Sequence, residues 1–221
     1  MPIKVRYNGV WSKGVPYIKQ GGVWVKAPMY VKQGGTWYIL TFDDPGSITY
    51  TTAGVFNFIV PNYETFLTVK GWGGGGSGGG NNTSNLIYNG TAGGATKFGS
   101  LMTANGGSAG SIGGGTPSGG TATGGTINTQ GGSGAVNNGG SSPNGGDGGT
   151  SGSRHGKAPG GGGLGYSFAS GGGAGGYFER TYSRGQLTPG TTIAVEVAAG
   201  VTASTSFTGD GARGELRITW G

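Results

Sequence analysis

Residues 71–80 read Gly-Trp-Gly-Gly-Gly-Gly-Ser-Gly-Gly-Gly, and further glycine-rich runs follow as far as Gly176. Of the 58 glycines in this 221-residue chain, 43 lie in this glycine block between Gly71 and Gly176. Glycine has no side chain to bury, and it loses more backbone entropy on ordering than any other residue. The glycine block therefore cannot form an ordinary apolar core, and any order in it must come from contacts between backbones.

Dissimilar segments interrupt the glycine runs and help to separate three interpretations of the block. A strict Gly-X-Y period is absent, which excludes collagen. A flexible linker is the second interpretation, but linkers do not usually contain runs such as LIY, KFGSLM or YSF. The chain has 10% charged and 10% aromatic residues, which is unlike the composition of most disordered chains. The interrupting segments are residues 81–92, 95–105, 126–130, 150–158 and 166–170.

An ordered bundle of glycine helices of the polyproline II type is the third interpretation, and it is the one that we predict. This extended left-handed helix makes no internal hydrogen bonds, so its amides point outward. Neighbouring helices can satisfy those amides only where no Cβ intervenes, which requires glycine at the packed positions. At about 3.1 Å per residue, the ten residues 71–80 span about 31 Å. The interrupting segments would then be loops at the two ends of a rigid scaffold, which is typical of a binding protein and not of an enzyme.

A short repeat occupies the first 40 residues, in which Trp11, Trp24 and Trp37 are spaced thirteen residues apart. An Asn-Gly or Gly-Gly pair lies two residues before each tryptophan, which is a strong signal for hairpins with two-residue loops. Such loops place a cation opposite each indole, a favourable cross-strand arrangement. The predicted pairs are Arg6 with Trp11, Lys19 with Trp24 and Lys32 with Trp37.

The net charge of +6 comes entirely from these 40 residues, which contain six basic and no acidic residues. A basic surface can bind nucleic acid, but here the cations recur within a repeat, and lysines also keep strand edges soluble. We expect no nucleic-acid partner. Because isolated hairpins are marginal in water, either the three indoles pack together as a small core or the three hairpins dock on the end of a three-fold symmetric trimer.

Segments rich in β-branched and aromatic residues flank the glycine block. Residues 47–51, 55–60 and 65–70 are predicted strands, and residues 191–197 and 215–220 are their predicted partners. The predicted fold class is mostly β and irregular, with a hairpin repeat module, a small β-sheet, a polyglycine II bundle and essentially no α-helix. Two domains are predicted, 1–42 with the three hairpins and 43–221, in which strands within 47–70 and 190–221 flank the block 71–176.

Few residues that carry catalysis or bind metals are present. His155 is the single histidine, there is no cysteine, and the eight acidic residues are scattered. Metal sites and serine–histidine–aspartate catalysis therefore have almost nothing to draw on. Residues 153–158 lack the first glycine and the final Ser/Thr of a phosphate-binding loop. We expect no catalytic residue, no metal and no cofactor.

Neither an apolar run of transmembrane length nor an apolar segment after the basic first residues is present. We therefore expect neither membrane insertion nor a secretion signal. A protein assembled into a virus particle in the cytoplasm and released by lysis has no need of either. Asn81, Asn82 and Asn89 lie in glycosylation-type triplets, and without a secretion signal they are interpreted as polar loop residues.

The glycine runs that alternate with dissimilar segments resemble the distal receptor-binding adhesins of T-even-type bacteriophage long tail fibres. The lead-in LTVKGWGGGG over residues 67–76 and the closing GELRITWG over residues 214–221 carry the same resemblance, which covers most of the chain from about residue 45 onward. It implies a layered polyglycine sandwich whose far-end loops bind host outer-membrane proteins. It also implies that a small N-terminal domain attaches the adhesin to the trimeric fibre protein, one adhesin per trimer. The predicted location is the virion, at the distal tip of the tail fibre. The predicted attachment residues are Arg6, Trp11, Lys19, Trp24, Lys32 and Trp37.

Receptor contacts are predicted in the interrupting segments, because rigid scaffolds commonly present recognition residues on loops and aromatic residues supply contact area. If the first run leads away from the sheet, residues 81–105 form the distal end, and residues 150–158 and 166–170 add further contacts. The predicted receptor-binding residues are Leu86, Ile87, Tyr88, Lys97, Phe98, Leu101, Met102, Arg154, His155, Lys157, Tyr166 and Phe168. The alternative is that the apolar members cover the flanks of the bundle.

Two other functions are compatible with a polyglycine scaffold. Aromatic loops would equally suit a tip that binds carbohydrate or lipopolysaccharide. An ice-binding bundle should show a regular grid of threonines on a flat face, and the irregular threonine spacing in this chain argues against it.

Overall fold

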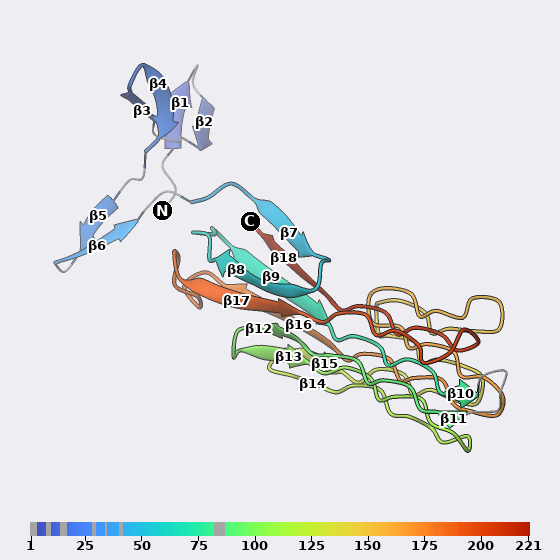
Figure 1. Ribbon diagram of the computed structural model, residues 1–221. Coiled ribbons are helices and arrows are strands. Elements are labelled where there is room, and N and C mark those ends of the chain that lie inside the picture. The colour runs from blue at the N-terminus through green and yellow to red at the C-terminus, as the bar shows by residue number, and fades with distance from the viewer. Residues whose placement is uncertain are drawn as a thin grey trace.

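The computed structural model describes residues 4–7, 10–13, 17–27, 30–33, 35–39, 42–81 and 87–221. Within these ranges every regular element is a β-strand or an isolated bridge, which confirms the predicted fold class without α-helix. Figure 1 shows sheets at one end of a long body and extended segments without strands over most of the other end.

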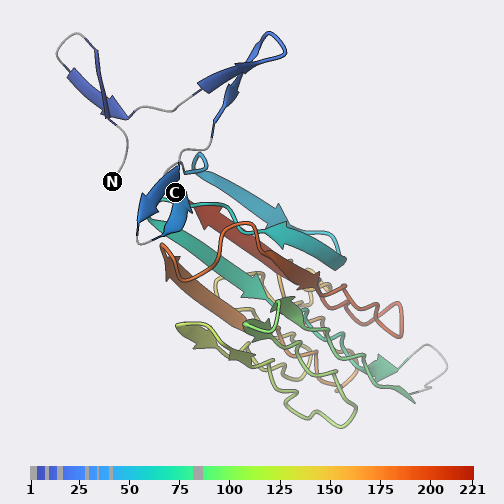
Figure 2. The same ribbon diagram turned by 90° about the vertical axis from the view of Figure 1, so that its left-hand side faces the viewer.

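The described residues between 4 and 39 form three two-stranded hairpins, each of which pairs only within itself (Figure 2). Arg6 pairs with Trp11, Lys19 with Trp24 and Lys32 with Trp37, which confirms the predicted register. Gly21 and Gly22 have φ values of 58° and 86°, as the type I′ turn of a two-residue hairpin requires. Trp24 is 63% exposed, so the other described residues do not bury this indole. The hairpin strands are β1 (Lys4–Tyr7), β2 (Val10–Lys13), β3 (Tyr17–Gln20), β4 (Val23–Lys26), β5 (Tyr30–Gln33) and β6 (Thr36–Ile39).

Two five-stranded antiparallel sheets follow, in the orders β15-β16-β9-β18-β7 and β14-β13-β12-β17-β8. β17 pairs along the whole of β8, and β18 lies between β7 and β9, which confirms the predicted pairing of strands from the two ends of the chain. The strands are β7 (Gly46–Tyr50), β8 (Gly54–Ile59), β9 (Phe66–Trp72), β12 (Thr96–Phe98), β13 (Met102–Ala104), β14 (Ala122–Thr123), β15 (Ile127–Thr129), β16 (Tyr177–Ser183), β17 (Thr192–Val197) and β18 (Glu215–Trp220).

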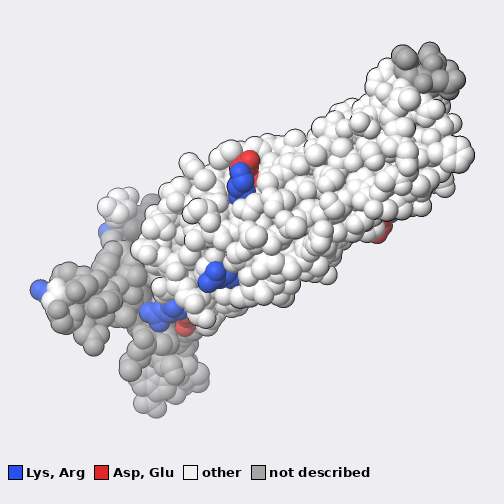
Figure 3. Space-filling model, turned by 90° about the horizontal axis from the view of Figure 1, so that it is seen from below, with Lys and Arg blue, Asp and Glu red and all other residues white. Residues whose placement is uncertain are grey.

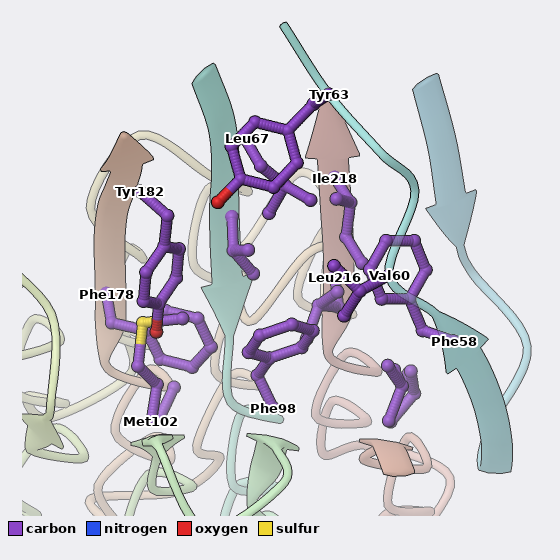
Figure 4. Packing of buried hydrophobic residues seen from close by; sticks show 14 residues of the cluster. Phe58, Val60, Tyr63, Leu67, Phe98, Met102, Phe178, Tyr182, Leu216 and Ile218 are labelled. Atoms are coloured by element: carbon purple, nitrogen blue, oxygen red, sulfur yellow. The ribbon is translucent and has the colours of Figure 1, made fainter. Parts of the chain in front are cut away.

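A single hydrophobic core lies between these two sheets (Figure 4). Leu67, Phe178 and Ile218 come from one sheet, and Phe58 and Phe98 from the other. The ring centroids of Phe58 and Phe98 are 6.0 Å apart. The sheets therefore form a small sandwich that anchors every excursion of the chain into the glycine-rich region.

Beyond the sandwich, extended runs of the chain lie side by side and bond through their backbones. In the central run, residues 73–80, every third amide donates to the same neighbouring run. Residues 73, 76 and 79 donate to the carbonyls of 176, 173 and 170. Residues 74 and 77 donate to those of 94 and 91. Residues 75 and 78 donate to those of 212 and 209, and all seven bonds measure 2.9–3.1 Å. Three residues per turn with outward amides is the geometry of a polyproline II-type helix, so the predicted glycine bundle is present.

Residues 170–176 form a second run with the same period of three. Residues 170, 173 and 176 donate to the carbonyls of 111, 108 and 105. Residues 171 and 174 donate to those of 135 and 132, and residues 172 and 175 donate to those of 163 and 160. The carbonyls of 170, 173 and 176 accept from 79, 76 and 73, and those of 172 and 174 accept from 140 and 120. Six neighbouring runs thus surround this one, and nearly every amide and carbonyl along it has a partner.

Close packing of the runs leaves no room for a Cβ at most of their positions. A Cβ built on Gly75 would overlap the carbonyl oxygen of Gly161, and one on Gly78 would overlap that of Leu164. Ser77 is the one position without glycine in the central run, and its buried Oγ accepts a hydrogen bond from the amide of Thr91 at 2.8 Å. Glycine is therefore required in these runs because a Cβ would not fit, and not because the residues adopt positive φ values.

The junction of the sandwich and the bundle is held by Trp72. Its indole lies 5.1 Å from the Tyr177 ring, and its Nε1 donates to the carbonyl of Pro143 at 2.8 Å. Arg217 lies over the indole at 4.9 Å and pairs with the buried carboxylate of Glu215. Burial raises the pKa of Tyr177 well above its usual 10.0, and a hydrogen bond to Glu179 adds to this shift. The junction is therefore tightly packed, and its charged side chains pair with one another.

We predict that Gly78→Ala destabilises the protein by about 3 kcal/mol or more, because the new Cβ would meet a backbone oxygen that cannot move without disrupting the neighbouring run. Gly152→Ala is the matched control, since nothing lies within 4 Å of a Cβ at that position. It should be neutral or slightly stabilising, by up to about 1 kcal/mol. Urea unfolding followed by tryptophan fluorescence measures both variants. Equal stability of the two would contradict the packing argument.

Candidate functional site

Six loops lie at the distal end, which we define as the end of the bundle remote from the sandwich. The directions of the hydrogen-bonded runs establish which loops these are. The central run leads away from β9, and the runs antiparallel to it lead back toward the sheets. β10 (Gly80–Asn81) and β11 (Ile87–Tyr88) lie at this end in Figure 1. The described residues of the distal loops are 87–89, 111–117, 135–138, 150–155, 165–169 and 202–208.

Side-chain hydrogen bonds connect these loops to one another. Asn89 joins three of them, because its Oδ1 accepts from the amide of Ile112 at 3.3 Å and its carbonyl accepts from the Ser204 hydroxyl at 2.9 Å. Arg154 donates to the carbonyl of Ser206 at 2.6 Å. The distal loops therefore form one connected surface on the rigid runs beneath them.

Large apolar side chains are exposed on this surface. Phe168 is 83% exposed and Ile87 is 64% exposed, whereas Tyr88, Ile112, Val136 and Tyr166 are between 36% and 44% exposed. Tyr166 also stacks on Phe207, with ring centroids 5.0 Å apart. The sandwich also exposes large apolar side chains, among them Val55 and Ile59, but on the distal loops they stand beside one another on connected loops, and a contiguous exposed apolar patch marks an interaction surface.

Charged side chains are almost absent from the described part of the distal loops. Arg154 is the one basic residue, and it is bonded to a neighbouring loop. His155 lies 3.0 Å from the carboxylate of Asp210. Figure 3 shows the same feature on one face of the molecule, where long stretches of the body carry few Lys, Arg, Asp or Glu side chains. The surface therefore offers shape and apolar area, with little net charge.

Half of the predicted receptor-binding residues lie at this distal end, namely Ile87, Tyr88, Arg154, His155, Tyr166 and Phe168. Lys157 lies on the run that returns toward the sheets, where its ammonium group pairs with Asp147 at 3.0 Å. Leu86 lies outside the described residues, and so do the side chains of Arg6, Trp11 and Trp37. Lys19, Trp24 and Lys32 are exposed on the hairpins.

Four predicted receptor-binding residues are at the opposite end, and for these the prediction of their position was wrong. The chain reverses after β11 and returns along residues 90–94, so residues 95–105 lie in the sandwich, where they include β12 and β13. Phe98 and Met102 are 0% and 1% exposed in its core. Lys97 pairs with Glu196 at 2.8 Å, and Leu101 is exposed in the turn between β12 and β13. The buried side chains of Phe98 and Met102 cannot contact a receptor, and Lys97 and Leu101 lie far from the distal loops.

Three distal loops, at residues 111–117, 135–138 and 202–208, were not predicted from the sequence. Ile112 and Val136 are single apolar residues between glycine runs, and this isolation was their one available signal. Residues 198–214 contain few glycines, so nothing in their composition indicated two further runs of the bundle.

Within the residues that the structure describes, no three or more His, Cys, Asp or Glu side chains group in a way that could hold a metal ion. In the same residues no helix has the length and apolar character needed to cross a membrane. Comparison of the chain with protein-family models, with curated proteins and with solved structures finds no match.

Proposed function

We propose that this protein is a bacteriophage tail-fibre tip adhesin that binds a receptor in the outer membrane of a host bacterium through its distal loops. The observation that carries the proposal is the separation of the two ends. A basic hairpin repeat lies at one end of the chain, and a neutral surface with exposed apolar loops lies at the far end of a rigid bundle. Such a scaffold holds loops in place at little entropic cost on binding. The resemblance to T-even-type fibre adhesins supports the same assignment.

An outer-membrane protein of the porin type is the proposed receptor class. The tip has few charges to place against the phosphates of lipopolysaccharide, whereas its exposed aromatic and aliphatic groups suit the apolar recesses between extracellular loops. A lipopolysaccharide receptor is the second candidate, favoured by the exposed ring of Tyr166 with polar residues beside its stacking partner Phe207.

Binding to defined bacterial mutants tests the receptor class. Labelled full-length protein should bind to a host strain and lose at least about 90% of that binding when a single porin gene is deleted, because a specific interface has one partner. Binding should persist on mutants with truncated lipopolysaccharide. The reverse pattern would establish the saccharide as the receptor. Loss of binding on the porin mutant and on the lipopolysaccharide mutants alike would show that the receptor consists of both components.

The hairpin module is the proposed attachment site for the trimeric long tail fibre protein, with one hairpin for each fibre chain and one adhesin for each trimer. This proposal would place the protein at the distal tip of the fibre in the virion. Its support is the identical register of three hairpins and the exposure of Trp24.

We predict that the triple variant Trp11→Ala, Trp24→Ala, Trp37→Ala fails to co-purify with the co-expressed fibre trimer, since large indoles are common binding hot spots. The variant should keep the melting temperature of the sandwich and bundle and should still bind to cells. Val55→Ala, which changes a side chain of β8 that is 70% exposed on the sandwich, is the control. Normal co-purification of the triple variant would exclude the docking role.

A further inference from the structure

The distal loop at residues 165–169 holds two adjacent residues in an unfavourable backbone conformation. Ser167 and Phe168 have φ values of 56° and 62°. Residues with a Cβ rarely adopt this left-handed region, and they remain there only where the surrounding structure imposes it. Phe168 is also the most exposed large apolar side chain of the described residues, at 83%. The combination of unfavourable backbone geometry and exposure indicates that this ring serves an external partner.

Ser167 and Phe168 are the central residues of a turn in which the amide of Ala169 donates to the carbonyl of Tyr166 at 3.4 Å, and hydrogen bonds to other segments hold both sides of this turn. The amide of Tyr166 donates to the carbonyl of Gly79 at 3.0 Å, in the central run. On the other side, the carbonyl of Ala169 accepts from the amide of Asn137 at 3.1 Å. Ser170 bonds to Ser111 through both backbone and side chain. Three different segments thus fix the ends of a loop whose two middle residues are exposed.

Two neighbouring loops that lie close to the Phe168 loop also carry exposed apolar residues. A Cβ built on Gly114 would lie 3.2 Å from Cγ2 of Val136 and 3.6 Å from the carbonyl oxygen of Phe168, so these loops are in close proximity. Val136 and Ile112 are 42% and 40% exposed. No charged residue occurs in the loops 111–117, 135–138 and 165–169. These loops therefore form an uncharged apolar corner of the distal surface.

We propose that Phe168 is the anchor of receptor binding, and that its ring enters an uncharged apolar recess on a protein partner, with Val136 and Ile112 covering the rim. This inference rests on the proposed function and specifies the partner chemistry. A phosphate-rich saccharide would find no cation among these three loops to pair with, whereas an apolar recess gains from the burial of an aromatic ring. Because the loop is already fixed, little loop entropy is lost when the ring binds.

Quantitative binding of full-length variants to outer-membrane vesicles tests the proposal. The vesicles come from a bacterial strain that the labelled wild-type protein decorates. Phe168→Asn removes the ring and keeps a residue that tolerates positive φ, so the loop conformation should persist. We expect this variant to bind at least about 30-fold more weakly, as for loss of a hot-spot aromatic residue. Phe168→Tyr, which retains the ring, should bind within about threefold of wild type.

Ile127→Asn is the matched control, because Ile127 is 50% exposed on β15, an edge strand of the sandwich. It should bind as the wild type does. Thermal melting of each variant shows whether it is folded. Binding of the wild-type protein should also change little with salt, since surface charge contributes little to an uncharged contact.

The outcomes separate this inference from the proposed function. If the wild type decorates cells and Phe168→Asn binds equally well, Phe168 is not the anchor and the inference fails alone. If the wild-type protein does not bind vesicles with truncated lipopolysaccharide, and protease treatment of normal vesicles does not reduce its binding, the partner is a saccharide and not a protein. Absence of wild-type binding to any bacterial surface would overturn the proposed function itself.

Discussion

The whole structure depends on one constraint, the pairing of backbone amides between extended chains that are packed too closely to admit a Cβ. A helix with three residues per turn directs successive amides to three different neighbours, as residues 73–79 show. Each run therefore needs several others around it, and the bundle can exist only as a set. The small sandwich supplies the starting positions, because each excursion from 73 to 176 and from 198 to 214 begins and ends near its strands. A single added methyl group in the interior disrupts more than its own contact, since the neighbouring run shares the hydrogen bonds.

Local signals in the sequence were sufficient for much of this fold. The Asn-Gly and Gly-Gly pairs predicted the hairpin register, and glycine density predicted the bundle between Gly71 and Gly176. The pairing of strands from the two ends of the chain was predicted from β-branched segments such as 191–197. Phe98 and Met102 could not be placed, because two short strands that join a core look like any apolar loop segment. The direction of each run was equally inaccessible, since it depends on where the chain reverses, and turns such as 111–117 carry no more signal than the glycines around them.

The arrangement separates rigidity from specificity. Buried glycine runs carry no side chains that a receptor could recognise, so they can remain constant while the distal loops vary. The positions at which those loops meet are fixed by a few polar side chains, among them Asn89 and Ser170. Phe168 shows the consequence most clearly, because residues 79, 111 and 137, which hold the ends of its loop, come from three other segments of the chain. Host recognition, as we propose it, would depend on this cooperation between loops.

The order of the glycine bundle is the central claim about this protein, and amide hydrogen exchange followed by nuclear magnetic resonance tests it directly. The amides of residues 73–79 and 170–176 should exchange as slowly as those of β9 and β18, because every one of them donates to another run. Exposed glycines such as Gly152 should exchange freely in the same sample. Exchange of residues 73–79 at the rate of an unfolded chain, with β9 and β18 still protected, would show a flexible linker and contradict the account.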